Sequence, residues 1–407
     1  LYMSANMFDC LNASCSSATY QEVRAYGLNI QDLISGATLR SIVVDTNSTA
    51  RFTLLPSNFR GTAPPAGRPN YFVGESSTLF AWEVFRFHVD YVTPASSTFT
   101  GPTNVAQASY VTAATTVPEP APGNATDTLA ERMMMQNQYR IIGGVESLWV
   151  NHTVGTAAAA TPTGIQWGQI NVTGNVVNTT PVQQQIFNNG ADGLNRFMGA
   201  IAVDRVGNMA IGYTASSAAV APDIRYAGRL STDPLNTLPQ TEVTMLPSVT
   251  RSVQTGTCGG ICTRWGDYSA MSIDPVDECT FWYTHHFFPV QGTNWVTRIG
   301  SFKFPSCVPT AAPVAISGRV LRPDGEGLSG VTITLNEGIG QRMTVTNTKG
   351  AYVFENVPVG TFCVLTATRK GYVFNPENIS FEAFSNAEGT FNGTPTVREI
   401  NPGRPFR

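Results

Sequence analysis

A unit of about seventy residues occurs twice in this sequence, and it constrains the fold more than any other feature. Each copy begins with an apolar run that ends in aspartate, continues through a Tyr-Thr pair and closes with a third apolar run. This pattern indicates a strand, a turn, a strand, a loop and a strand. So small a sheet cannot bury both faces alone, and repeated copies therefore pack against one another. The matching segments are residues 200–204 with 270–274, 213–214 with 283–284, and 224–228 with 297–300.

The rest of the chain favours an all-β protein. Helical periodicity is nearly absent, and short runs of β-branched and aromatic residues are separated by Gly, Pro, Asn and Asp. Weaker relatives of the repeat occupy residues 2–28, 72–84 and 146–170. Repeated small sheets of this kind pack around an axis in propellers. The sequence therefore predicts a β-propeller of about five or six blades over residues 1–307.

The predicted ring of blades has an open seam. Leu1 already lies in strand-like sequence, and the last repeat ends after its 298–304 run without a further strand. Either a targeting peptide has been removed before Leu1 or the chain is a mature fragment. Because an unpaired sheet edge readily pairs with another strand, we expect a strand from this chain or from another copy to close the seam.

The C-terminal part has a different pattern. Residues 308–313 are rich in Pro and Ala and are typical of a stiff linker. Residues 314–394 alternate between apolar and polar side chains at regular turn spacing, which predicts an Ig-like β-sandwich of seven strands. Residues 395–407 remain as a tail, which either frays in solvent or adds to a sheet edge as a donor strand. The candidate assembly strand consists of Thr396, Val397, Arg398, Glu399 and Ile400.

The seven cysteines indicate an oxidising compartment if they form disulfides between near neighbours. The alternative for Cys258 and Cys262 is half of a zinc site, although no second cysteine pair or spaced histidine pair accompanies them. Cys363 lies in an alternating strand pattern and is predicted to be a buried, inert thiol. The predicted disulfides are Cys10–Cys15, Cys258–Cys262 and Cys279–Cys307.

Low charge narrows the possible partners. Charged residues make up 13% of the chain, the formal net charge is -3, and no run of Lys or Arg is present. Nucleic acid and anionic membrane surfaces are therefore disfavoured, and no apolar run is long enough to span a bilayer. Sugar attached to Asn-x-Ser/Thr sequons would keep such a chain soluble outside the cell. In the alternative interpretation these asparagines are ordinary polar turn residues. The predicted glycosylation sites are Asn12, Asn47, Asn124, Asn151, Asn171, Asn178, Asn378 and Asn392.

Two acidic turns are candidates for binding a calcium ion. Asp204 with Asn208, and Asp274 with Asp277, present hard oxygen ligands within a turn. In the competing interpretation these side chains cap the backbone of their own turns. No glycine-rich phosphate loop and no serine nucleophile motif is present, so nucleotide binding and serine hydrolysis have no support.

Both parts of the chain resemble known families. Residues 198–228 and 264–302 resemble secreted bacterial sialidase-like propellers of the BNR type. Residues 314–394 are similar to carboxypeptidase-regulatory-like or Cna-B-like sandwiches, through Gly318-x-Val320, Thr348-x-Gly350-x-Tyr352-x-Phe354, Pro358-x-Gly360 and Gly371-Tyr372-x-Phe374. The second resemblance implies a rigid spacer; the Lys–Asn crosslink of some Cna-B-like domains is not expected, because the first strand offers Arg319 and Arg322 instead of Lys.

The two resemblances together imply a subunit of an extracellular surface assembly such as a fibril. Our leading hypothesis is a non-enzymatic, extracellular, glycosylated structural protein that assembles head to tail into a surface filament or adhesive layer, with itself as partner. A carbohydrate-binding or glycoside-hydrolysing propeller is the alternative, and an adhesin with a protein receptor is the third. The sialidase-type residues are Arg225, Arg264, Arg298, Tyr226, Tyr283, Asp267 and Glu146, but the family's Asp-box motif has only a partial match at residues 204–208.

Overall fold

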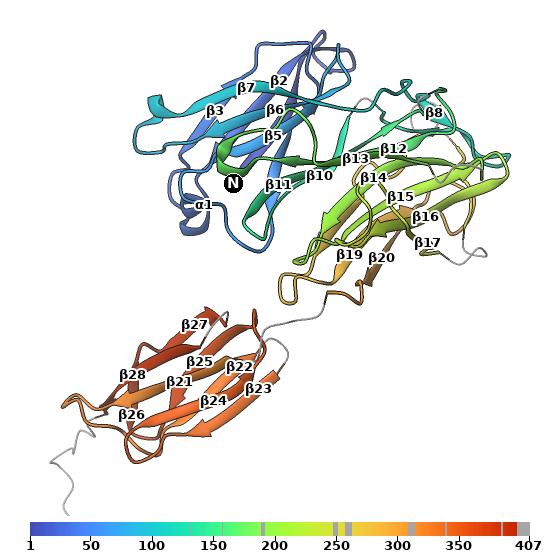
Figure 1. Ribbon diagram of the computed structural model, residues 1–407. Helices are drawn as coiled ribbons and strands as arrows, with labels where there is room; N and C mark the ends of the chain where they lie inside the picture. Colours follow the sequence, from blue (N-terminus) through green and yellow to red (C-terminus); the bar gives the residue numbers. More distant parts are fainter. Residues whose placement is uncertain are drawn as a thin grey trace, which may run out of the picture. The chain divides into compact units, whose positions relative to one another are not determined.

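The computed structural model divides the chain into two compact units (Figure 1). Unit 1 comprises residues 1–274 and 278–307, and unit 2 comprises residues 275–277 and 308–407. The predicted linker at 308–313 and most of the C-terminal tail lie outside the described residues. The residues that the structure describes are 1–130, 132–156, 158–188, 192–246, 251–256, 263–307, 314–337, 340–383 and 386–396.

The all-β prediction is confirmed. Among the described residues the one α-helix, α1 (Ile30–Ser35), is six residues long, and the rest of the regular structure is β-strand with short 3-10 turns. Asn29 begins α1 by accepting hydrogen bonds from the first-turn N–H groups, and Gly36 ends it in the left-handed conformation. A helix that could cross a bilayer is not found in the described part of the chain.

The first part of unit 1 forms a three-stranded sheet, β1-β2-β3, and an eight-stranded sheet in the order β13-β12-β11-β10-β4-β5-β6-β7. A small additional sheet pairs β8 with β9. The strands are β1 (Tyr2–Cys10), β2 (Ala18–Leu28), β3 (Ser41–Asp45), β4 (Leu55–Phe59), β5 (Asn70–Glu75), β6 (Ala81–His88), β7 (Thr98–Ala106), β8 (Thr116–Val117), β9 (Thr126–Asp127), β10 (Met133–Ile142), β11 (Val145–Val154), β12 (Gly164–Asn171) and β13 (Gln183–Phe187).

The described residues do not show the predicted propeller. Strands β4 to β7 and β10 to β13 are each four consecutive strands, as in a blade, but the two groups join edge to edge in one curled sheet. The junction is a parallel pairing in which Asn137–Tyr139 of β10 lies against Ser57–Phe59 of β4. The Asn137 side chain reinforces it by donating hydrogen bonds to the carbonyls of Leu55 and Tyr71, both at 3.0 Å. Two predicted blades therefore form a single sheet.

The two copies of the repeat form the remaining sheets of unit 1, as the sequence predicts. The first copy gives the four-stranded sheet β14-β15-β16-β17, and the second gives the three-stranded sheet β18-β19-β20, all antiparallel. The strands are β14 (Asn195–Val203), β15 (Met209–Ser217), β16 (Val220–Arg229), β17 (Gln240–Thr244), β18 (Ala270–Ile273), β19 (Phe281–Phe287) and β20 (Val296–Phe302).

Strand pairing corrects the alignment of the third strand of the repeat. Tyr213 lies opposite Arg225, whereas its counterpart Tyr283 lies opposite Gly300. Arg298, opposite His285, is therefore the counterpart of Asp223, which lies opposite Ala215, and not of Arg225. The reason is loop length, because residues 218–219 connect β15 to β16 but residues 288–295 connect β19 to β20.

The two repeat sheets share a core. Its buried members include Ile224 from the first copy and Met271, Phe281 and Tyr283 from the second. Gly212 of β15 allows this contact, because a Cβ atom there would lie 2.3 Å from the Tyr283 ring. One face of the β18-β19-β20 sheet is thereby fixed against the β14–β17 sheet.

Two of the three predicted disulfides are present in the structure. Cys10 is bonded to Cys15, and Cys279 is bonded to Cys307. The Cys279–Cys307 bond links the start of β19 to the segment that follows β20, so it closes the second copy of the repeat covalently. Cys258 and Cys262 lie outside the described residues.

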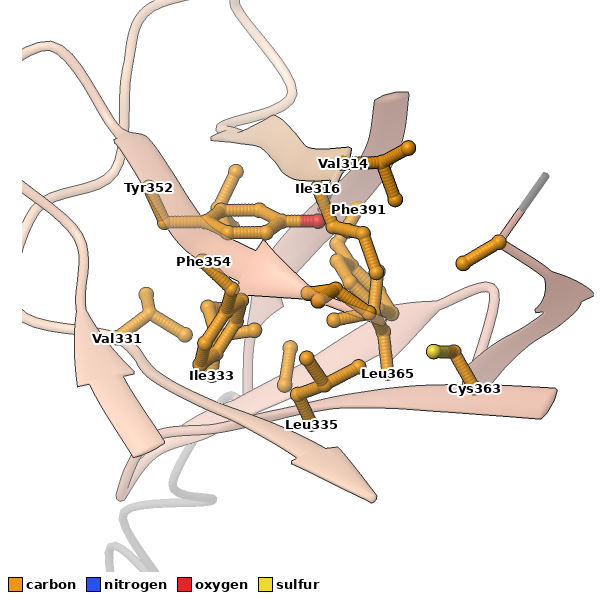
Figure 2. Packing of buried hydrophobic residues seen from close by; sticks show 14 of the residues in the cluster. Val314, Ile316, Val331, Ile333, Leu335, Tyr352, Phe354, Cys363, Leu365 and Phe391 are labelled. Atoms are coloured by element: carbon orange, nitrogen blue, oxygen red, sulfur yellow. The ribbon is translucent and has the colours of Figure 1, made fainter. Parts of the chain in front are cut away.

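Unit 2 contains the predicted sandwich. Two four-stranded sheets, β24-β21-β28-β26 and β23-β22-β25-β27, enclose a core that includes Ile316, Leu335, Phe354 and Phe391 (Figure 2). Eight strands are present instead of the seven predicted, and residues 372–382 divide into two of them, one in each sheet. The strands are β21 (Val314–Leu321), β22 (Thr332–Glu337), β23 (Gly340–Val345), β24 (Ala351–Val357), β25 (Phe362–Thr368), β26 (Tyr372–Asn375), β27 (Asn378–Glu382) and β28 (Ala387–Pro395).

Cys363 belongs to the sandwich core, as its strand pattern predicts. The thiol is free and fully buried, with its side chain directed among the apolar residues (Figure 2). Burial raises the pKa of this thiol to about 11. Since the thiolate is the reactive form, Cys363 is inert at neutral pH.

Candidate assembly interface

The first copy of the repeat shows what a complete sheet of this type contains. Its fourth strand, β17, pairs with β16 so that Val243 lies opposite Tyr226. The Glu242 side chain of β17 accepts hydrogen bonds from Arg225, from Arg196 at 2.8 Å and from the Tyr213 hydroxyl at 2.7 Å. The fourth strand thus supplies a carboxylate to two arginines of the sheet.

This carboxylate compensates a buried positive charge. The Arg196 side chain is fully buried, and it is also paired with Asp192 at 2.6 Å. Burial alone would raise the pKa of Glu242, but the hydrogen bonds from Tyr213 and Arg225 and the charge of Arg196 lower it overall. Glu242 is therefore ionised at neutral pH and neutralises the arginines beside it.

The second copy lacks a fourth strand among the described residues, so β20 is the last strand of its sheet. Several large apolar side chains on or beside β20 are exposed, with Ile299 at 60% and Trp295 at 59%. Trp282 and Val296 are each 42% exposed. We call the outer side of β20 with these four residues the β20 edge. Edge strands with exposed apolar side chains pair readily with a further strand.

Arg298 lies in the middle of the β20 edge. Its side chain is exposed, and among the described residues it has no hydrogen-bond or ion-pair partner. In the complete sheet, by contrast, Arg225 is bonded to both Asp223 and Glu242. The β20 edge therefore combines an unpaired strand, exposed apolar area and a free positive charge.

The N-terminal sheet is less open than predicted. The seam was expected at its first strand, but side chains of β1 bind the segment that precedes β4. Asn6 donates to the Thr53 hydroxyl at 3.0 Å and accepts from the Thr53 N–H at 2.9 Å, and the Ser4 hydroxyl donates to the Leu54 carbonyl. Side chains on one face of β1 thereby bind a segment of the same chain.

The predicted donor strand begins directly after the sandwich. Strand β28 ends at Pro395, and the Thr396 N–H donates a hydrogen bond to the Gly371 carbonyl at 2.9 Å. Thr396 is thus held by unit 2. Val397, Arg398, Glu399 and Ile400 lie outside the described residues.

Two of the candidate calcium residues, Asp204 and Asn208, stabilise their own turn. One oxygen of Asp204 accepts from the N–H groups of Val206 and Asn208, and the other accepts from the Asn208 amide at 2.7 Å. Asp274 accepts from the Trp282 indole at 3.0 Å. The described residues contain no group of three or more His, Cys, Asp or Glu side chains suited to a metal ion. For Asp204 and Asn208 the structure favours the capping interpretation.

The sialidase-type residues bind separate structural partners. Arg225 is bonded to Asp223 and Glu242, whereas Glu146 is bonded to the Tyr139 hydroxyl at 2.6 Å and to Arg68. The other members have structural partners: Arg264 pairs with Asp267, Tyr226 stacks on Phe302, and Tyr283 is buried in the shared core, against which Tyr226 also packs. Glycoside hydrolysis through this set therefore has no support in the described residues.

The sequons differ in accessibility. Asn151 is fully buried on β11, and its amide donates a hydrogen bond to the Met135 carbonyl at 3.3 Å, so the folded chain does not present this predicted glycosylation site at its surface. Asn124 and Asn171 are half-buried. The exposed sequons are Asn12, Asn47, Asn178, Asn378 and Asn392.

A buried cluster that the sequence did not indicate lies beside a cavity of about 380 Å³. Glu75 lies 3.2 Å from the Nε2 atom of His152 and accepts hydrogen bonds from Gln107 and the Tyr110 hydroxyl. Burial raises the pKa of Glu75 to about 8 and lowers the pKa of His152 to about 3, so both groups are neutral at pH 7. These residues come from separate strands and loops, which is why no local motif marks them.

Glu75 makes folding stability depend on pH. The unfolded chain loses this proton above about pH 4.5 but the folded chain keeps it until about pH 8, so stability falls as the pH rises through that window. We expect Glu75→Gln to reduce the alkaline loss of stability, by at most about 5 kcal/mol. Thermal unfolding followed across the window tests this, with the exposed Glu355→Gln as control. Parallel pH profiles for the Glu75→Gln variant and the parent chain would contradict it.

Comparison with known proteins supports the C-terminal part of the resemblance. Residues 315–373, from β21 to β26, match the family model described as carboxypeptidase regulatory-like domain. No curated protein matches the chain. A solved structure described as a Ca2+-stabilized adhesin that helps an Antarctic bacterium bind ice has 10% identity over 92% of this chain and 93% of its own, with a TM-score of 0.10. That score gives no information about the fold or function of this chain. The family match at residues 315–373 shows that unit 2 contains a carboxypeptidase regulatory-like β-sandwich.

Proposed function

We propose that this protein is a non-enzymatic structural protein of the cell exterior that assembles with copies of itself by strand addition. One observation carries the proposal: among the described residues the second copy of the repeat has one strand fewer than the first, and the β20 edge is left exposed. An edge of this kind is costly to leave unpaired in a soluble chain. A donated strand would satisfy its backbone groups and cover its apolar side chains.

The chain carries a candidate donor of its own. Residues 396–400 follow the last strand of the sandwich and contain two β-branched apolar residues, Val397 and Ile400, on either side of Arg398 and Glu399. Donor and acceptor then belong to different surfaces of the molecule, so the contact is head to tail. Repetition of such a contact does not close on itself, and a filament results. The sandwich acts as the spacer between successive copies of unit 1.

The exterior location rests on the disulfides and the sequons. Disulfides persist in oxidising compartments, and two are present here. Five sequons lie on exposed residues, so covalent sugar at these sites would solubilise a surface that is poor in charge.

Deletion of residues 397–407 tests the proposed function. We expect the full chain to form long assemblies and the deleted chain to remain monomeric, because the donor strand has been removed while Thr396 keeps its bond to Gly371. Light scattering coupled to size-exclusion chromatography measures the assembly, and an unchanged thermal unfolding curve shows that the fold is retained. Assembly of the deleted chain at the same concentration as the full chain would rule out this function.

A further inference from the structure

We propose that the acceptor is the β20 edge, where the tail of a second copy takes the place that β17 takes in the first copy of the repeat. This inference rests on the proposed function and specifies which surface receives the strand. It predicts a four-stranded sheet in the order β18-β19-β20-tail, with the tail antiparallel to β20, as β17 is to β16.

The tail resembles β17 at the glutamate of β17 and the residue that follows it. In β17, Glu242 is followed by Val243, and in the tail Glu399 is followed by Ile400. Glu242 lies on the same face of its sheet as Tyr213 and Arg225 and binds both. Both segments thus offer a carboxylate next to a β-branched side chain, which lie on opposite faces of a strand.

The β20 edge offers matching partners. Arg298 lies opposite His285 on the face that turns toward the β14–β17 sheet, and Ile299 lies on the other face. An antiparallel tail that places Glu399 opposite Arg298 places Arg398 opposite Ile299 and Ile400 opposite Thr297. Arg398 and Ile400 then lie beside Ile299 and cover it, while Glu399 neutralises Arg298.

In both sheets the carboxylate of the fourth strand would bind an arginine of the third strand, but the two arginines do not occupy equivalent positions. Arg298 is the counterpart of Asp223, so the arginine that meets the donated glutamate lies two residues along the strand from the counterpart of Arg225. Both positions lie on the same face because side chains alternate along a strand. The carboxylate of the added strand therefore reaches an arginine on the corresponding face in both sheets.

The two edges of the N-terminal sheet suit this strand less well. Side chains of β1 already bind Thr53 and Leu54 of the same chain. The β3 edge offers Asp45, which is paired with Arg24, so a donated Glu399 would meet a like charge there. A strand that lacks an acidic residue would leave the charge of Arg298 uncompensated. Arg298 therefore makes the contact specific for a strand with a carboxylate.

Charge reversal separates this inference from the proposed function. We expect Arg298→Glu and Glu399→Arg each to raise the protein concentration at which assembly begins by at least about tenfold, and the double variant R298E/E399R to recover most of the loss. Lys349→Glu, which makes the same charge change on unit 2, is the control and is expected to assemble normally. If Arg298→Glu assembles like the parent while deletion of 397–407 abolishes assembly, the acceptor is wrong but strand donation stands.

A disulfide trap tests the register directly. Residues 299 and 398 are opposite each other in the proposed pairing, so Ile299→Cys with Arg398→Cys is expected to give a ladder of crosslinked copies after mild oxidation. Ile299→Cys with Glu399→Cys is the matched control, because residue 399 lies on the other face of the tail. Absence of a ladder in the 299/398 variant despite normal assembly, or crosslinks formed only within single chains, would overturn the inference.

Discussion

Replacing Glu242 by alanine is expected to destabilise unit 1 by about 3 to 5 kcal/mol, the usual cost of removing one partner from a buried ion pair. The substitution removes the carboxylate that binds Arg196, Arg225 and the Tyr213 hydroxyl, and Arg196 is fully buried. Asp192 alone would then compensate the Arg196 charge. The free energy of unfolding, measured by chemical denaturation, gives the size of the loss.

Thr241→Ala is the matched control for this experiment. Thr241 is the exposed neighbour of Glu242 on the same strand, so its replacement should change stability by less than about 0.5 kcal/mol. A loss of similar size for both variants would mean that β17 itself, and not its carboxylate, stabilises the sheet. That outcome would remove the physical basis for assigning the same role to Glu399.

Replacing Gly318 by valine is expected to unfold the sandwich, at a cost of at least about 4 kcal/mol. A Cβ atom at Gly318 would lie 1.8 Å from the carbonyl oxygen of Gly389, the residue opposite it on β28, and 2.6 Å from the Tyr352 hydroxyl. That hydroxyl donates to the Gly389 carbonyl at 2.8 Å, so none of the three groups can retreat alone. Hydrogen exchange of unit 2 in the full chain measures the effect.

Gly340→Val is the control for the sandwich. A Cβ atom at Gly340 would lie 3.7 Å from its nearest neighbour, the Glu337 carbonyl, which is an ordinary contact. Valine also favours extended strands such as β23. Protection of unit 2 in the Gly318→Val variant equal to that of the Gly340→Val variant would show that β21 and β28 do not approach each other as described.

Local pattern predicted much of this fold. The seventy-residue repeat predicted β14 to β16 and β18 to β20, and the motif around Gly318 predicted the sandwich that the family match now supports. Two disulfides followed from the proximity of their cysteines in the sequence. Each of these features depends on alternation, turn spacing or a short loop, all of which are written in neighbouring residues.

Long-range contacts could not be predicted in the same way. The parallel pairing of β10 with β4, which merges two expected blades, depends on Asn137 reaching the carbonyls of Leu55 and Tyr71. The burial of Asn151 and the contact between Glu75 and His152 also arise between distant segments. Periodicity determines whether a segment forms a strand, but the choice of neighbouring strand depends on packing across the whole unit.

The sequence predicted an open sheet edge, but it placed the acceptor at the first strand and not at β20. An unsealed edge followed from the absence of a fourth strand after residue 304, yet side chains of the expected acceptor, the first strand, already bind Thr53 and Leu54. The exposed side of β20 and the unpaired state of Arg298 became visible only in three dimensions. The sequence contains the proposed donor and the proposed acceptor, but the proposed register between them required the pairing of β19 with β20.

Electron cryomicroscopy of the assembled full chain is the most direct test of strand donation. The account predicts filaments in which density for residues 397–400 of one copy forms a fourth strand along β20 of the next, with the glutamate at 399 beside Arg298. Single particles in which β20 stays bare, or filaments whose contacts leave the tail unpaired, would contradict it.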